Sequence, residues 1–393
     1  MNSKFTLSLR AMLAVLTLIV LSACSGSSTG IVSNLGNTTS AGGGSVPAAG
    51  KAVRHVFILV LENKNFTDTF STTPPAPYLA TTLPKMGTLL TQYYGTGHVS
   101  LDNYISMVSG QAPNPATQSD CLFYSEFVAL PVPVTDGQAV GAGCVYPSSV
   151  KTVVDQLEAA GFTWRQYAED MANSAPAVAS TCRHPPLNMQ DQWQNATATD
   201  QYATRHVPFL YFHTVIDAQA RCDQHVVDLK LLDADLASIA TTPNYVFITP
   251  DLCSDGHDAT CIDTKQKGGF GGINDFLSVW VPKITSSPAF QKDGLLMVLF
   301  DEAEPGTNAE SSTACCNEQM GFNTPMAGVY GMGGGRVGAV LVSPFIKPGS
   351  VSDTPYNHYS MLRSVEDIFG LPHLGYAGQT GLVPFGADVF NAP

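Results

Sequence analysis

The chain has 393 residues, of which 44% are hydrophobic, and this is enough to build one large folded domain. It carries 32 acidic residues against 19 lysines and arginines, which gives a net charge of −13. A surface this acidic argues against a nucleic-acid partner, because phosphate backbones attract lysine and arginine.

The N-terminus is typical of an export signal. Lys4 and Arg10 flank the start of the chain, and the apolar run at residues 11–21 is short for a membrane span. The following Leu-Ser-Ala-Cys ends at Cys24, and it is typical of a bacterial lipoprotein whose cysteine becomes the lipidated N-terminus. An ordinary secretory signal cleaved nearby is the alternative. We expect residues 1–24 to be a lipoprotein signal peptide, and the protein to be exported and either anchored to the cell envelope or secreted.

Residues 25–50 are mostly serine, glycine, alanine and threonine, which is typical of a flexible tether. We therefore expect one folded domain at residues 51–393. Within it lie eight cysteines, an even number that favours disulfides in an oxidising compartment. The adjacent Cys315 and Cys316 either bridge each other or bond elsewhere. The other six are expected to pair locally, as Cys121–Cys144, Cys182–Cys222 and Cys253–Cys261.

Short runs rich in valine, isoleucine, leucine and phenylalanine alternate with helix-like segments along the domain. This pattern predicts an α/β fold with a mostly parallel central sheet sandwiched by helices. We expect strands at residues 56–61, 163–167, 209–212, 245–249, 295–300 and 337–343, and helices at residues 78–87, 149–160, 226–240, 272–286 and 359–369.

Two predicted strands end on acidic and amide side chains. Glu62 and Asn63 follow the strand at 56–61, and Asp301 and Glu302 follow the strand at 295–300. Ligands of such sheets bind beyond the carboxyl ends of the strands. Any one of these side chains alone is more often a helix cap or a solvated loop residue, but their convergence favours a divalent cation, because uncompensated buried carboxylates are costly.

Further polar residues follow the remaining strands. Asp251, Asp255 and His257 come after the strand at 245–249, and His358 follows the last predicted strand. We therefore expect four strand ends to bring polar side chains to one edge of the sheet.

Ser100 is the candidate nucleophile. It stands just before a predicted helix that begins near Leu101 or Asp102. A helix N-terminus offers free amide groups and positive potential, which suit a phosphoryl group. A serine hydroxyl needs a metal or a base to activate it. The alternative is that Ser100 only caps the helix.

Several segments, in order, resemble one known family. They are "HVFILVLENKNF", "HVSLDNYISMVSG", "WRQYAEDM", "RHVPFLYF", "TPDLCSDGHD", "FDEAE" and "VSPFIKPG" with "YNHYSMLRSVEDIFGLP". Together they are similar to the bacterial phosphoesterase family of acid phosphatases and phospholipases C, within the alkaline phosphatase superfamily. The resemblance covers residues 55 to about 375 and implies an alkaline-phosphatase-like fold.

The resemblance also implies roles for individual residues. Ser100 would be the nucleophile, and Asn103 would hydrogen-bond a phosphoryl oxygen. Asp102 stands where the family usually has proline, which places an extra negative charge beside the phosphate unless its side chain points away. Glu62 and Asn63 would bind a divalent metal, with Asp301 and Glu302 completing its shell; His98, His257 and His358 would contact phosphate, transfer protons to the leaving group or hold a second metal.

These implications give one expected function and two alternatives. The first is an exported, metal-dependent hydrolase of phosphate monoesters that acts through a phosphoserine. The second is a phospholipase C acting on lipid headgroups, and the third is a non-catalytic surface lipoprotein. The partners would be a phosphate ester and the membrane, the latter through Cys24. The metal could be calcium, magnesium, manganese, zinc or iron.

Overall fold

The computed structural model describes residues 45–173, 180–306, 310–318 and 321–391. The predicted signal peptide and most of the predicted tether lie outside these residues. Val46 is buried in the hydrophobic core, and its backbone N–H donates to Asp367 Oδ2 at 3.4 Å. The folded part therefore includes residues that precede the predicted boundary at residue 51. Among the described helices, none is both long and apolar enough to cross a bilayer.

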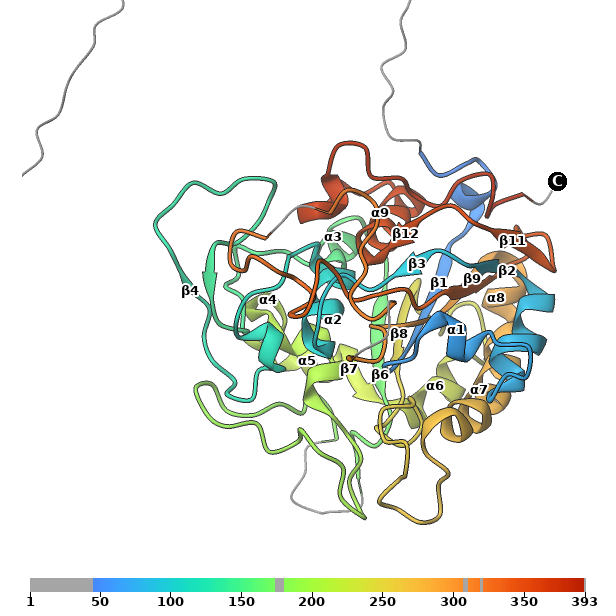
Figure 1. Cartoon of the computed structure of the whole chain (residues 1–393), viewed down its shortest axis with the longest axis horizontal. Helices are drawn as coiled ribbons and strands as arrows, with labels where there is room; N and C mark the ends of the chain where they lie inside the picture. The colour runs from blue at the N-terminus through green and yellow to red at the C-terminus, as the bar shows by residue number, and fades with distance from the viewer. Residues whose placement is uncertain (1–44, 174–179, 307–309, 319–320, 392–393) are drawn as a thin grey trace, which may run out of the picture. The chain divides into compact units, whose positions relative to one another are not determined.

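An eight-stranded sheet forms the centre of the domain, in the order β11-β2-β10-β9-β1-β8-β6-β7 (Figure 1). The five strands from β9 to β7 run parallel to one another, and β10 is antiparallel to both of its neighbours. The strands are β1 (His55–Leu61), β2 (Thr88–Leu90), β6 (Trp164–Ala168), β7 (Val226–Asp228), β8 (Tyr245–Thr249), β9 (Gly294–Phe300), β10 (Ala339–Val342) and β11 (Ser350–Ser352).

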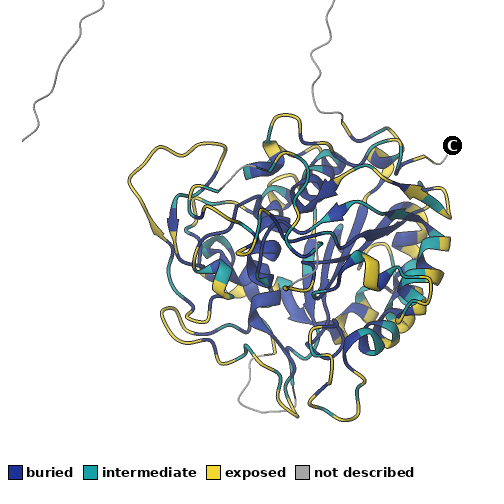
Figure 2. Cartoon of the chain, in the orientation of Figure 1, coloured by how far each residue is buried: buried dark blue, intermediate teal, exposed yellow. Residues whose placement is uncertain are grey.

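The central strands are buried along their whole length, as the dark interior of Figure 2 shows. Every residue of β1 and β9 is buried, which matches their continuous apolar sequence and requires cover on both faces of the sheet. The predicted fold class, a mostly parallel sheet covered by helices, is thus confirmed.

Helices lie on both sides of this sheet (Figure 1). Helix α2 (Ser100–Ser109), α3 (Val153–Ala159) and α9 (His358–Phe369) contact one another, whereas α7 (Gly269–Ser286) contacts α8 (Pro288–Asp293) and β9. Every residue of α2 is buried. The helix ends at Gly110, whose φ of +67° is a left-handed conformation that glycine adopts without strain.

Four short α-helices complete the described part of the chain: α1 (Phe66–Thr69), α4 (His213–Ile216), α5 (Gln219–His225) and α6 (Leu232–Asp235). Two small sheets lie outside the central one. They pair β3 (Tyr93–Tyr94) with β12 (Tyr356–Asn357), and β4 (Val128–Ala129) with β5 (Gly141–Ala142).

Three expected elements differ from the structure. Residues 209–212 do not form a strand, because Pro208 begins a short 3-10 helix, Pro208–Tyr211, that is buried without joining the sheet. The predicted helix at 226–240 begins instead with β7 and continues as short helical turns. The predicted helix at 78–87 is a π-helical turn followed by a 3-10 turn, Leu83–Met86, with a proline at its start. The other predicted strands and helices are present with shifted ends.

The disulfides follow the predicted local pattern. Cys121–Cys144, Cys182–Cys222 and Cys253–Cys261 are bonded, and the adjacent Cys315 and Cys316 bridge each other. The first three bridges span 23, 40 and 8 residues of sequence and stabilise the domain by constraining its unfolded state.

Candidate active site

The acidic residues of the site are placed by the register of two neighbouring strands. Leu61 of β1 pairs with Phe300 of β9, so the next residues, Glu62 and Asp301, emerge side by side at the carboxyl edge of the sheet. At Asn63 the chain turns with a φ of +51°, a left-handed conformation that asparagine tolerates better than most residues. The backbone N–H of Asn63 donates to Asp301 Oδ1 at 3.1 Å.

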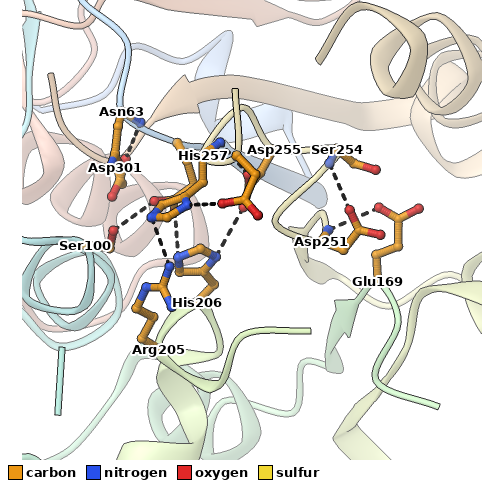
Figure 3. A network of polar contacts seen from close by, with 12 residues as sticks. Asn63, Ser100, Glu169, Arg205, His206, Asp251, Ser254, Asp255, His257 and Asp301 are labelled. Carbon is orange, nitrogen blue, oxygen red and sulfur yellow. Dashed lines mark hydrogen bonds and ion pairs between the residues drawn. The ribbon is translucent and has the colours of Figure 1, made fainter. Parts of the chain in front are cut away.

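Ser100 meets this acidic pair from the opposite direction. It is the first residue of α2, after an N-cap position that Val99 occupies. Its hydroxyl donates to Glu62 Oε2 at 2.8 Å, so it is directed at the acidic cluster and does not cap its own helix (Figure 3). One turn further on, the hydroxyl of Tyr104 donates to the other oxygen of Glu62. Helical spacing therefore places both hydroxyls on the same carboxylate.

The oxygen atoms around Asn63 fit a bound cation. The terminal amide atom that Asn63 directs at the acids lies 3.0 Å from Glu62 Oε2 and 3.1 Å from Asp301 Oδ1. If this atom is nitrogen, it donates to both carboxylates. If it is oxygen, three oxygens from three residues face one another, which is the arrangement that a hard divalent cation requires.

Two further observations agree with a cation at this place. Asp301 Oδ2 and Glu302 Oε1 are buried and have no hydrogen-bond partner among the described residues. Burial raises the pKa of Glu62 well above its ordinary value, and the neighbouring Asp301 raises it further. Burial and the adjacent Glu302 likewise raise the pKa of Asp301. A positive charge in the cluster would compensate these carboxylates.

Basic side chains line the other side of the site. His206 lies between two acids, with Nε2 at 3.4 Å from Glu62 Oε1 and Nδ1 at 3.3 Å from Asp255 Oδ2. Its ring stacks on Tyr104, with 5.3 Å between the ring centres. Burial, followed by the charge of Arg205, lowers the pKa of His206 well below its ordinary value. A neutral imidazole in this position, with Glu62 and Asp255, could itself contribute to a metal site.

Arg205 links this basic side to the nucleophile helix. Its Nη2 lies 3.1 Å from His257 Nε2, and its Nε lies 3.7 Å from Asp120 Oδ2. The other oxygen of Asp120 accepts the backbone N–H of Leu101, in the first turn of α2, at 3.0 Å. A buried guanidinium, an imidazole and a helix N-terminus thus lie close together beside Ser100 and form a suitable environment for an anion (Figure 3).

The remaining predicted residues occupy distinct positions. Glu302 and His98 contact each other, and the second nitrogen of His98 bonds the carbonyl of Ser311. His358 Nε2 lies 2.5 Å from the backbone carbonyl of Asp301, and burial lowers the pKa of this histidine to about 4. His98 and His358 therefore border the acidic cluster without pairing with Glu62.

Asn103 holds the loop that precedes Ser100. Its side-chain oxygen accepts the backbone N–H groups of Thr96 at 2.8 Å and Gly97 at 3.0 Å, and its amide nitrogen donates to the carbonyls of Gly97 and Val99. In this structure the amide of Asn103 positions the loop, and its predicted contact with a phosphoryl oxygen stays a prediction.

Asp102 and Asp251 are both buried, and neither bonds the hydroxyl of Ser100, which donates to Glu62. Asp102 is buried against Gly97, where an added Cβ would lie 2.4 Å from Asp102 Oδ1. Asp251 accepts the backbone N–H groups of Cys253 and Ser254, so it stabilises the turn that delivers Asp255. Both carboxylate oxygens of Asp102 are buried without a hydrogen-bond partner among the described residues, and burial, followed by the charge of Glu302, raises the pKa of this carboxyl well above its ordinary value.

Four residues of the site were not predicted from the sequence. Tyr104 could have been found, because it follows Ser100 by four residues and shares its helical face. His206 has no signal of its own in the sequence, because no periodic pattern surrounds the segment that carries it. Asp120 and Arg205 meet only through the tertiary fold, although Arg205 belongs to one of the motifs that carry the resemblance.

The fold and the site together define an α/β protein in which an acidic cluster faces a serine hydroxyl at a helix N-terminus. The chain belongs to the Phosphoesterase family, whose sequence model matches residues 75–372. This confirms the predicted family. The match includes Ser100, Arg205, His206 and Asp301, and it begins after Glu62.

Named relatives are similar over most of the chain. A probable acid phosphatase of Kluyveromyces lactis is 26% identical over 343 residues, which cover 87% of this chain and 64% of the relative. The chain thus spans less than two thirds of that relative's length. A phosphatidylinositol-3-phosphatase of Mycobacterium tuberculosis is 23% identical over 85% of both chains. A solved structure from Vibrio parahaemolyticus, described as a protein in the alkaline phosphatase superfamily, is 13% identical over 81% of this chain and 67% of its own, with a TM-score of 0.46.

Proposed function

We propose that the protein is an exported, metal-dependent phosphoesterase that hydrolyses phosphate monoesters through a phosphoserine at Ser100. The observation that carries the proposal is the hydrogen bond of 2.8 Å from the Ser100 hydroxyl to Glu62, within the cluster that also contains Asn63 and Asp301. The names of the relatives, acid phosphatase and phosphatidylinositol-3-phosphatase, support the same class of reaction.

The chain's own residues account for the geometry of the first step. Ser100 Oγ forms the bond to phosphorus, the bond from phosphorus to the ester oxygen breaks, and the hydroxyl proton is directed at Glu62. The N-terminal turn of α2 and the Arg205 guanidinium stabilise the negative phosphoryl oxygens. His257 is one third exposed, and its Nε2 accepts a hydrogen bond from Arg205, so it orients the guanidinium while water supplies the proton that the leaving oxygen takes up. Water then hydrolyses the phosphoserine and regenerates the hydroxyl.

Glu62, Asn63 and Asp301 would hold a divalent cation, with Glu302 beside them. When bound, such an ion lowers the pKa of a hydroxyl and neutralises charge that develops on the phosphoryl group. The unpartnered buried oxygens of Asp301 and Glu302 support this assignment.

The test is a comparison of two serine variants of the same helix. Ser100→Ala should lower the hydrolysis of p-nitrophenyl phosphate by more than about a thousandfold and leave the bound metal and the fold unchanged. Ser109→Ala is the matched control, because Ser109 is also buried in α2 and its hydroxyl bonds only backbone groups near it in the chain, the carbonyl of Ile105 and the N–H of Gln111. Peptide mass spectrometry after an acid quench should find phosphate on Ser100 of the wild-type protein. Full activity in Ser100→Ala would contradict the proposal.

One observation favours a lipid phosphomonoester as a second class of substrate. The relative named phosphatidylinositol-3-phosphatase covers the same 85% share of both chains, whereas the acid phosphatases are much longer than the matched region. Assays with p-nitrophenyl phosphate, p-nitrophenyl phosphorylcholine and a lipid phosphomonoester separate a monoesterase from the phospholipase C alternative. Inactivity on all three would favour the non-catalytic lipoprotein.

Export and anchoring are part of the proposal and have a separate test. Mass spectrometry of the mature N-terminus should find an acylated Cys24, and Cys24→Ser should release the protein from the membrane fraction. An N-terminus created by cleavage elsewhere would favour the secreted form.

A further inference from the structure

The hairpin of β4 and β5 exposes an uncharged apolar segment. Residues 127–134 read Phe-Val-Ala-Leu-Pro-Val-Pro-Val, with no charged side chain. Val128 is 69% exposed and Val134 is 66% exposed, and Leu130 and Val132 are also exposed. In Figure 2 this hairpin is the long exposed loop at the left of the molecule. Exposed apolar side chains gathered in this way mark an interaction surface.

A second uncharged segment lies against the hairpin. Residues 321–335 contain no charged side chain. Asn323 joins the two segments, since its side chain accepts the N–H of Gly141 at 2.7 Å and donates to the carbonyl of Ala139 at 2.9 Å. The exposed apolar side chains of this segment are Phe322, Met326, Val329, Tyr330 and Met332. We call residues 127–134 and 321–335 together the apolar rim.

The apolar rim reaches the edge of the candidate active site. The carbonyl of Ala327 accepts the backbone N–H of His98 at 3.1 Å. Gln118, two residues before Asp120, donates to the carbonyls of Met326 and Ala327. The backbone carbonyls of Met326 and Ala327 therefore bond groups that lie on either side of Ser100 in the chain.

We propose that the apolar rim docks the folded domain onto the surface of a lipid bilayer. The absence of charge suits an acyl-chain environment, in which ionised side chains are costly. Tyr330 is 74% exposed and has the amphipathic character of residues that lie at membrane interfaces. Pro131 and Pro133 lack backbone N–H donors, so the hairpin tip is poorly suited to pairing with a strand of another chain.

The place where the described chain begins supports a bilayer as the partner. The 44 residues before the described part include the apolar run 11–21 and the predicted anchor Cys24. The described chain starts at Ser45, and the next residue, Val46, bonds Asp367, which contacts His373 at 2.9 Å. His373 lines a cavity of about 410 Å³ together with Leu130, Val132 and Val134. The described chain thus begins two contacts away from His373, one of the residues that line this cavity together with the apolar rim.

The test places tryptophan reporters in the full chain. Val132→Trp and Tyr330→Trp lie in the rim, and Val351→Trp is the matched control, because Val351 is 58% exposed in β11 at the opposite side of Figure 1 from β4. Each variant is mixed with zwitterionic vesicles of brominated phosphatidylcholine, and the signal of the three native tryptophans is subtracted. Both rim reporters should be quenched at least about fivefold more than the control, at low and at high salt, because burial in acyl chains is not an ionic effect.

A second variant separates docking from nonspecific insertion. Adding Val132→Asp and Val134→Asp should remove the quenching of the Tyr330→Trp reporter, whereas adding Val351→Asp should not. The thermal unfolding transition, followed by circular dichroism, should stay unchanged in these variants, which checks their fold. Equal quenching at all three positions, no quenching in the rim, or concentration-dependent dimers that cover the rim without vesicles would each overturn the proposal. None of these readouts requires the proposed catalytic function.

Discussion

The acidic and basic sides of the candidate site are built in different ways. Glu62 and Asp301 are consecutive with paired residues of two buried parallel strands, so their separation is set by the sheet. Arg205 and His206 lie in a short 3-10 turn, Thr204–His206, within the long connection between β6 and β7. The acidic side is therefore positioned by strand pairing and is suited to a cation. The basic side is positioned by side-chain contacts, among them those of Arg205 with Asp120, His257 and Gln194, and is suited to an anion.

The largest expected effect comes from changing the acidic side. Asp301→Asn should reduce the bound metal and lower the rate on the order of a thousandfold, because it removes one charge from the proposed ligand set. Elemental analysis and steady-state kinetics measure both effects. Asp293→Asn is the matched control, since Asp293 directly precedes β9, at the opposite end of the strand from Asp301, and its side chain pairs with His55 at 2.5 Å. Unchanged metal content in Asp301→Asn would show that the acidic side does not bind it.

A smaller effect is expected from the basic side. Arg205→Met should lower kcat/KM about a hundredfold without changing the metal content, because the guanidinium would contact the phosphoryl group and not the cation. Arg205→Lys should recover part of the loss by restoring the charge without the planar donor geometry. Arg183→Lys controls for the loss of a buried arginine, because Arg183 is paired with Asp200 outside the site. A loss of metal in Arg205→Met would remove the distinction between the two sides.

The smallest effect is expected at Glu366, a buried carboxyl outside the site. It measures how burial alone makes the free energy of unfolding depend on pH. Burial raises the pKa of Glu366 well above its ordinary value of 4.5, and its Oε1 accepts the N–H of Leu374 at 2.9 Å. Above pH 4.5 the unfolded chain loses this proton first, so the folded state binds more protons and its stability falls as the pH rises.

Glu366→Gln keeps the hydrogen-bond acceptor and removes the titration. It should raise the free energy of unfolding at neutral pH by about 1–3 kcal/mol and flatten its dependence on pH, with no change in metal content or rate. Denaturant unfolding at several pH values provides the measurement. A variant whose stability still falls with pH as in the wild type would assign the pH dependence to other groups.

Most of the acidic side was accessible from the sequence. Apolar runs that end on Glu62 and Asp301 predict buried parallel strands, and such strands end at a common edge. The direction of the last strand was not accessible, because β10 is antiparallel to β9 and its carboxyl end points to the other edge. His358 reaches Asp301 from the junction of β12, in a small separate sheet, with α9. The sequence instead predicted that it follows a strand of the central sheet.

The sequence by itself determined the buried strands, the local disulfide partners and the pairing of a serine with a helix N-terminus, because these depend on residues close together along the chain. Only the tertiary structure decided which histidine faces Glu62, how Asp120 joins Arg205 to α2, and which strand is antiparallel to its neighbours. Those outcomes depend on contacts between segments far apart in the chain, whose pairing is selected by burial of the whole sheet and leaves no periodic pattern in any one segment.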